Sequence, residues 1–275
     1  MWLARVCSAL VLFAIFFATI YIHSLTWLFA IIVVATTGLA LSEYITMMRK
    51  RGYRTQSVLS YSIGLGILAD GYFFRAQHTL ELLLASLIIS FLIQMKRQGF
   101  EKAHSTVSGT VMGQLYVVAP LAFALCILRR EDFGPHLIVF MILVTWAADT
   151  GAYAVGSAIG KHKMSPVLSP NKTWEGAVGG VVFGIATALL LFCFWPGMRS
   201  KLLLAEAALL GTVFSIVGQL GDLAESALKR ETGIKDSGKT YTGHGGMLDV
   251  IDSLLFVSPA FYYYLYHLYP LIERP

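Results

Sequence analysis

Acidic and basic side chains gather in one short stretch of a chain that is otherwise apolar, residues 218–252 (GQLGDLAESALKRETGIKDSGKTYTGHGGMLDVID). Asp222 and Glu225 are three positions apart, and so are Asp249 and Asp252. Residues three or four apart share one face of a helix, so this spacing predicts two acidic helix faces, one at each end of the stretch. Carboxylates are the ligands that a hard cation such as Mg²⁺ prefers.

The segment between the two acidic faces is cationic and rich in glycine. Its candidate residues are Lys229, Arg230, Lys235, Asp236, His244, Gly245 and Gly246. Glycine lets backbone amides approach a ligand closely, and a loop of this composition can bind phosphate. Carboxylates for a metal beside cations for phosphate indicate a metal-assisted nucleotide site.

Two further features precede this stretch. Asp149 lies in an apolar run, where a carboxylate costs about 2.5–3.5 kcal/mol on insertion scales and therefore needs a partner, a metal or water. The next polar loop contains SPNKTWEG, in which a proline turn would aim a cation and hydroxyls at a phosphate near a helix N-terminus. The candidate substrate-binding residues of this loop are Lys161, Ser169, Asn171, Lys172, Thr173 and Glu175.

Each feature also has a purely structural interpretation. Asp149 could make an interhelical hydrogen bond. The basic loop could be a solvated segment at an anionic membrane surface. Glu225 and Lys229 are four apart in the order that favours an ion pair, and acidic residues at Asp249 and Asp252 suit a helix N-terminus without any metal. Two acidic pairs facing one loop favour the functional interpretation.

The composition identifies an integral membrane protein. Of 275 residues, 56% are hydrophobic and 13% charged, and the mean hydropathy is +0.68, which is too apolar for a soluble domain of this length. The net charge of +5 is typical of the cytoplasmic face of a membrane protein, so we expect no nucleic-acid partner.

Nine apolar runs have lengths that can cross a bilayer. They are residues 3–22, 25–42, 57–74, 79–95, 107–128, 135–158, 177–196, 202–224 and 247–269. We therefore predict an all-α polytopic membrane protein of about nine transmembrane helices, folded as one integrated membrane domain. Its N-terminal half, 1–134, holds spans one to five; the C-terminal half, 135–275, holds spans six to nine, the motifs and the catalytic cavity.

The distribution of cations predicts the orientation of these spans. With Arg5 counted on the N-terminal side, 15 of the 21 Lys and Arg residues lie on that side of the membrane. The positive-inside rule then places the N-terminus and both polar loops in the cytoplasm. Rows of small residues, such as Ala148, Ala152, Gly156 and Gly160, suggest close helix packing and make a homodimer plausible.

The run SALKRETGIKDSGKTYTGHGGMLDVID resembles the signature of the phosphatidate cytidylyltransferases, also called CDP-diacylglycerol synthases. Its matching residues are Ser226, Lys229, Arg230, Lys235, Asp236, His244, Gly245, Gly246, Asp249 and Asp252. The upstream DTGAY, GK and SPNKTWEG elements are similar to the same family, so the resemblance covers about residues 145–256. Val250 departs from the family pattern, which has an arginine there, and removes one cation that could bind phosphate. Tyr241 and Thr242 are further departures.

The resemblance implies transfer of CMP from CTP to phosphatidic acid, giving CDP-diacylglycerol and pyrophosphate, in phospholipid biosynthesis at the cell inner membrane. The implied catalytic residues are Asp222, Lys229, Arg230, Lys235, Asp236, His244, Asp249 and Asp252. Mg²⁺ would be held by some of Asp149, Asp222, Asp249 and Asp252, and a second cation is left open. The lipid substrate would come from the membrane and CTP from the cytoplasm.

Two other functions compete with this one. A CDP-alcohol phosphatidyltransferase would carry a D-G-x2-A-R run, which this sequence lacks. An ion or solute carrier could line its pathway with Asp149 and Asp222. The charges concentrate on one side of the membrane, whereas a carrier needs a site that is accessible from both sides.

Overall fold

The computed structural model describes residues 26–96, 102–131, 133–195, 197–234, 237–238 and 245–269. Helices make up almost all of this part of the chain. In chain order the elements are α2 (Thr26–Lys50), α3 (Ser57–Phe73), α4 (Thr79–Lys96), α5 (Ala103–Gly113), the π-helical η3 (Gln114–Val118), α6 (Ala119–Leu128), α7 (Gly134–Ile159), β1 (Lys163–Ser165), β2 (Ser169–Thr173), α8 (Trp174–Phe194), η4 (Met198–Ser200), α9 (Leu204–Thr232), α10 (Met247–Tyr263) and η5 (Tyr264–Leu268).

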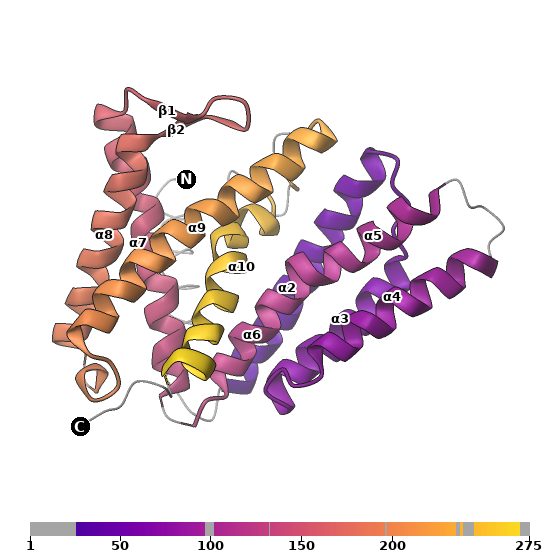
Figure 1. Ribbon diagram of the computed structural model, residues 1–275, viewed down its shortest axis with the longest axis horizontal. Coiled ribbons are helices and arrows are strands. Elements are labelled where there is room, and N and C mark those ends of the chain that lie inside the picture. Colours follow the sequence, from indigo (N-terminus) through magenta and orange to yellow (C-terminus); the bar gives the residue numbers. More distant parts are fainter. Residues whose placement is uncertain are drawn as a thin grey trace, which may run out of the picture.

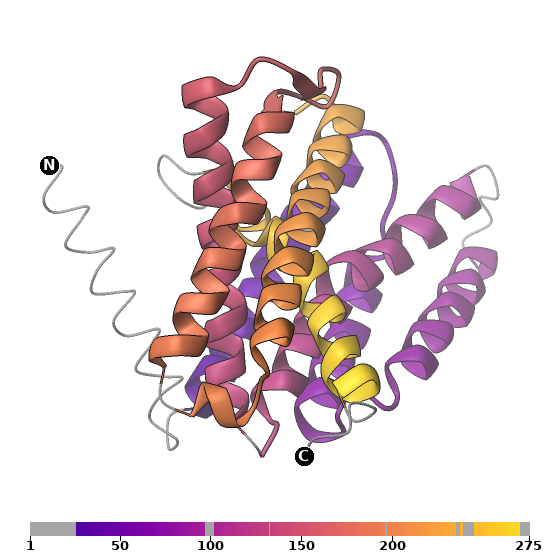
Figure 2. The ribbon, with the colours of Figure 1, turned by 60° about the vertical axis from the view of Figure 1, so that its left-hand side comes forward.

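The helices form two groups with α10 between them. Figure 1 shows α7, α8 and α9 on one side of the molecule and α2 to α6 on the other. In the turned view, α7, α8 and α9 run side by side (Figure 2). α10 packs against α9 and α7 of the first group and against α6 and α2 of the second. The N-terminal half of the chain therefore lies directly against α10, the helix that follows residues 233–246, which we call the signature loop.

The predicted all-α membrane fold is confirmed. All eight apolar runs predicted between residues 25 and 269 coincide with helices, whereas the first predicted run, 3–22, lies outside the described residues. Six helical stretches of the described part are long and apolar enough to cross a membrane. α3 and α10 have 17 residues each, at the short end of spanning lengths. The count of nine is thus not confirmed.

α9 continues past the predicted end of its apolar run at residue 224 and ends at Thr232. Its last turn closes on Gly233, whose φ of 70° is left-handed. There the amide of Gly233 donates to the carbonyl of Arg230 (3.2 Å), and the amide of Ile234 donates to the carbonyl of Lys229 (3.0 Å). This Schellman-type end keeps the whole charged segment up to Arg230 helical.

Close contacts at glycine hold α7, α8 and α9 together. A Cβ on Gly176 of α8 would lie 2.7 Å from the carbonyl oxygen of Ala152, and one on Gly211 of α9 would lie 2.8 Å from the Cα of Ile185. Larger side chains would therefore push the helices apart. The row of small residues along α7 that favoured a homodimer is used in part for packing within the chain, since Ala152 and Gly156 contact Gly176 of α8.

A β-hairpin connects α7 to α8, where the sequence predicts only a turn. β1 and β2 are antiparallel, and Lys163 pairs with Thr173 and Ser165 with Ser169. The hairpin reaches from the ends of α7 and α8 toward the C-terminal part of α9 (Figure 1). Thr173 ends β2 and caps α8, because its Oγ1 accepts a hydrogen bond from the amide of Gly176 (3.1 Å).

Candidate active site

The ammonium group of Lys229 lies between two carboxylates. Its Nζ is 2.5 Å from Oε2 of Glu225, one turn earlier on α9, and 2.6 Å from Oδ1 of Asp249 on α10. The side chain of Glu225 is fully buried, while those of Lys229 and Asp249 are 15% and 13% exposed. The ion pair predicted between Glu225 and Lys229 is confirmed, and it extends to a second helix.

The other oxygen of Asp249 organises the start of α10. Oδ2 accepts hydrogen bonds from the amide of Gly246 (2.6 Å), the amide of Ser237 (3.0 Å) and the hydroxyl of Ser237 (2.8 Å). An acidic residue in the first helical turn is also favoured by the helix dipole. The structural interpretation of Asp249 is therefore confirmed, and its assignment as a metal ligand stays a prediction.

A second carboxylate reaches the same helix start from the N-terminal half. Glu43 of α2 accepts hydrogen bonds from the amides of Met247 and Leu248 (both 2.9 Å), and its Oε2 lies 3.1 Å from the hydroxyl oxygen of Ser237. Glu43 is not among the site residues predicted from the sequence, since it lies one position after the apolar run 25–42. The available signal was its charge, because an ionisable residue at the end of a spanning segment needs a partner.

The β-hairpin adds a second pairing of a cation with a carboxylate. Nζ of Lys172 on β2 is 2.8 Å from Oδ2 of Asp222 on α9, and these side chains are 20% and 37% exposed. Nε of Arg230 donates to the carbonyl of Leu168 in the hairpin (3.0 Å). Two predicted phosphate-binding residues, Lys172 and Arg230, thus dock the hairpin onto α9.

Three of the predicted metal ligands come from three different helices. Asp149 of α7, Asp222 of α9 and Asp252 of α10 interact electrostatically with one another, and Lys172 also acts on Asp149. Oxygen donors of this kind fit a hard cation such as Mg²⁺. Within the described part of the chain, no three His, Cys, Asp or Glu side chains are arranged so that they could hold a metal ion. The donor chemistry fits Mg²⁺, and binding would require these side chains to converge.

Tyr116 is a second residue near the carboxylates that the sequence did not predict. It belongs to the π-helical turn η3, and such turns are frequent at functional sites. Its hydroxyl is buried and has no hydrogen-bond partner among the described residues. It interacts electrostatically with Glu225, Asp252 and Asp222. The N-terminal half therefore contributes a polar group to the surroundings of the carboxylates.

Glu175 fastens the beginning of the hairpin. Its carboxylate accepts hydrogen bonds from the amides of Lys161 and His162 and lies 2.6 Å from Nδ1 of His162. On β2, Ser169 is half-buried and Asn171 is exposed. Substrate binding by these residues stays a prediction.

The signature loop is only partly described. Lys235, Asp236 and His244 lie outside the described residues. Gly245 has a φ of 85°, which is left-handed, and Gly246 precedes the first residue of α10. Val250, which replaces the family's arginine, is exposed on α10.

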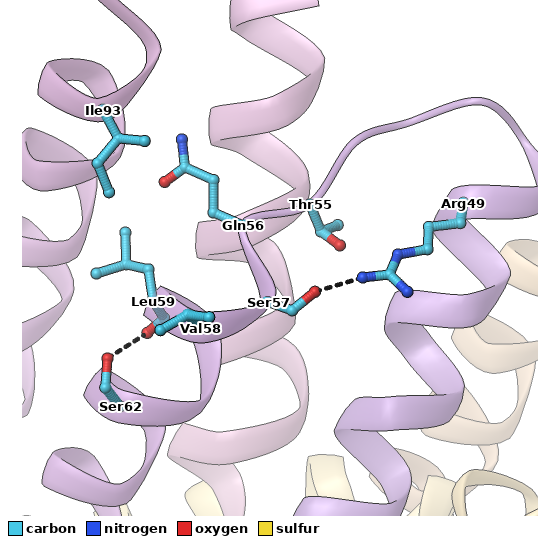
Figure 3. Close-up of a pocket in the computed structure, with 8 residues that line it drawn as sticks. All are labelled: Arg49, Thr55, Gln56, Ser57, Val58, Leu59, Ser62 and Ile93. Carbon is cyan, nitrogen blue, oxygen red and sulfur yellow. Dashed lines mark hydrogen bonds between the residues drawn. The ribbon is translucent and has the colours of Figure 1, made fainter. Parts of the chain in front are cut away.

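A separate pocket opens among α2, α3 and α4. Its volume is about 410 Å³, and Nη2 of Arg49 donates to the hydroxyl of Ser57 (2.7 Å) in its wall (Figure 3). Its lining residues are Arg49, Thr55, Gln56, Ser57, Val58, Leu59, Ser62 and Ile93. None of the predicted site residues lines it, so it is distinct from the carboxylate cluster, and the predicted catalytic cavity stays a prediction.

The sequence is similar to known proteins. The sequence profile described as the cytidylyltransferase family matches residues 3–268. Phosphatidate cytidylyltransferase of Staphylococcus saprophyticus is 47% identical over 126 residues, which are 46% of this chain and 47% of that protein. The protein of the same name from Staphylococcus haemolyticus is 47% identical over 130 residues, covering 47% of this chain and 48% of its own length. The aligned segment spans about half the length of these curated relatives.

Proposed function

The chain belongs to the cytidylyltransferase family, and on this basis we propose that it transfers CMP from CTP to phosphatidic acid, giving CDP-diacylglycerol and pyrophosphate. The names of the curated relatives support this pair of substrates. The observation that carries the proposal is the pairing of Lys172 with Asp222, where the hairpin contacts α9, and of Lys229 with Asp249, where α10 contacts α9. Such a site offers both cations for phosphate and carboxylates for a metal.

In the proposed reaction, a phosphate oxygen of phosphatidic acid attacks the α-phosphorus of CTP. The bond from that phosphorus to the bridging oxygen breaks, and pyrophosphate leaves with the electron pair. A phosphate monoester is already anionic, so positioning and charge neutralisation dominate and no strong general base is needed. Lys172 and Lys229 would supply positive charge, and Asp222, Asp249 and Glu225 hold these ammonium groups in place before substrate arrives.

We also propose that Asp149, Asp222 and Asp252 would hold Mg²⁺. When bound, the ion supplies neutralisation of the triphosphate and of the leaving pyrophosphate. Asp249 has both oxygens engaged, by Lys229 on one side and by Ser237 and Gly246 on the other. We assign it to the positioning of Lys229 and of the loop.

An integral membrane protein with this activity needs CTP from water and lipid from the bilayer. We propose the cytoplasmic membrane as its location, with the N-terminus and the active site facing the cytoplasm. The distribution of Lys and Arg supports this orientation, because 15 of these 21 residues are assigned to that side of the membrane. The hairpin and the C-terminal end of α9 lie at the same end of the molecule, which agrees with one aqueous face for the site (Figure 2). The homodimer stays a prediction.

The test is Mg²⁺-dependent release of pyrophosphate from CTP and phosphatidic acid by purified protein in detergent. Transport cannot be scored without a sealed compartment, so lipid-dependent release would support the enzyme over a carrier. We expect Asp249→Asn to lower the rate strongly and Lys163→Met, at an exposed position of β1, to leave it unchanged. Absence of release from the unaltered protein at any Mg²⁺ concentration would contradict the proposal.

A further inference from the structure

We propose that Glu43 of α2 is a positioning residue for the active site. It binds the first amides of α10 and Ser237 of the signature loop, and these segments position Asp249 and, through it, Lys229. Its catalytic consequence rests on the proposed function. Glu43 lies outside the region that resembles the family signature, about residues 145–256. The structure nevertheless places Glu43, which is 7% exposed, in hydrogen-bond contact with Met247 and Leu248 of that signature.

The first turn of α10 needs partners for its amides, since the first four N–H groups of a helix have none within the helix. The residue before the helix is Gly246, which has no side chain to cap it. Asp249 accepts from the amide of Gly246, and Glu43 accepts from those of Met247 and Leu248. The capping group that usually comes from the N-cap residue is here supplied by a helix 204 positions earlier in the chain.

Ser237 connects the two carboxylates. Its hydroxyl oxygen is 3.1 Å from Oε2 of Glu43 and 2.8 Å from Oδ2 of Asp249. Asp249 in turn contacts the ammonium group of Lys229. A continuous set of polar contacts therefore runs from α2 through the signature loop to α9, and displacement of Glu43 would be transmitted to Lys229.

Two glycines leave room for the Glu43 carboxylate beside the signature loop and the start of α10. A Cβ on Gly246 would lie 2.5 Å from Oε2 of Glu43, and a Cβ on Gly238 would collide with Oε1 of the same carboxylate. A side chain at either position would displace the Glu43 carboxylate from its present place. A residue far from the signature thus gives a physical reason for two glycines within it.

The experiment compares Glu43→Gln with Glu206→Gln. Glu206 is a matched control, since it is also buried, accepts from the amide of Leu203 (2.7 Å) at the start of α9, and pairs with the hydroxyl of Tyr264. Hydrogen exchange of the peptide that contains Met247 and Leu248 is measured first, in nanodiscs and without substrate. We expect exchange at least tenfold faster in Glu43→Gln and unchanged in Glu206→Gln.

Steady-state kinetics provide the second readout, at a temperature where all four variants are folded. We expect kcat/KM for CTP to fall at least tenfold in Glu43→Gln and to stay unchanged in Glu206→Gln. Glu43→Asp, which keeps the carboxylate, should have a higher kcat/KM than Glu43→Ala. Unchanged exchange at the start of α10, or an equal loss of kcat/KM in the Glu206 control, would overturn the proposal. An inactive unaltered protein would overturn the proposed function instead. The hydrogen-exchange comparison would then still decide whether Glu43 stabilises the start of α10.

Discussion

Lys229→Met tests whether one ammonium group joins α9 to α10. The substitution keeps most of the length of the side chain and removes its charge, which leaves two carboxylates facing each other. Glu225 is fully buried, and its side chain interacts both with this lysine and with Asp249. Asp249 would retain the donors of Ser237 and Gly246.

The structure sets the size of the expected effect. Breaking a buried ion pair by removing one partner typically costs about 3–5 kcal/mol. Because Lys229 and Asp249 are partly exposed, we expect a loss near the lower limit, about 3 kcal/mol. The assay is reversible unfolding in mixed micelles, followed by circular dichroism as the fraction of SDS rises.

A double variant separates loss of the pair from loss of packing. Adding Glu225→Gln removes the uncompensated charge, so the double variant should recover about 2 kcal/mol of the loss through coupling between residues in contact. Lys163→Met, at an exposed position, should change the unfolding free energy by less than about 0.5 kcal/mol. A loss below about 1 kcal/mol in Lys229→Met, or additive losses in the double variant, would refute the reasoning.

Three further outcomes are expected. Lys172→Met should change the unfolding free energy by less than about 1 kcal/mol, since its pair with Asp222 is partly exposed. It should nevertheless raise the KM for CTP about tenfold, because it removes a cation that binds phosphate. An unchanged KM would contradict this role of Lys172. Tyr116→Phe should leave the unfolding free energy unchanged or raise it by about 1 kcal/mol, because the hydroxyl has no hydrogen-bond partner among the described residues. A clear loss of stability in the same SDS titration would contradict this, since it would mean that the hydroxyl makes a stabilising hydrogen bond. Chelation of Mg²⁺ should abolish pyrophosphate release, and added Mg²⁺ should restore it in the unaltered protein; activity that persists in chelator would exclude the proposed metal.

Much of the fold follows from local patterns in the sequence. Apolar runs of spanning length place the helices, because each run must satisfy its own backbone hydrogen bonds in the bilayer. The three- and four-residue spacing along α9 correctly predicts the ion pair of Glu225 and Lys229. The acidic residue Asp249 at the start of α10 is explained by the same local rules.

Contacts between distant segments could not be predicted in this way. The sequence does not show that Lys229 also contacts Asp249, or that Glu43 accepts from Met247, since both depend on how α2, α9 and α10 pack. The strand at Ser169 was predicted as a turn, because Pro170 suggests one and a five-residue strand carries little periodic signal.

The most direct measurement of the proposed activity follows each phosphate of CTP. Purified protein is incubated with phosphatidic acid, Mg²⁺ and CTP labelled with ³²P at either the α or the γ position, and lipid is separated from water by extraction. The proposed reaction predicts that the α label appears in the lipid fraction as CDP-diacylglycerol and the γ label in the aqueous fraction as pyrophosphate. The two products should form in equal amounts. Release of γ label as inorganic phosphate with no α label in the lipid would contradict it.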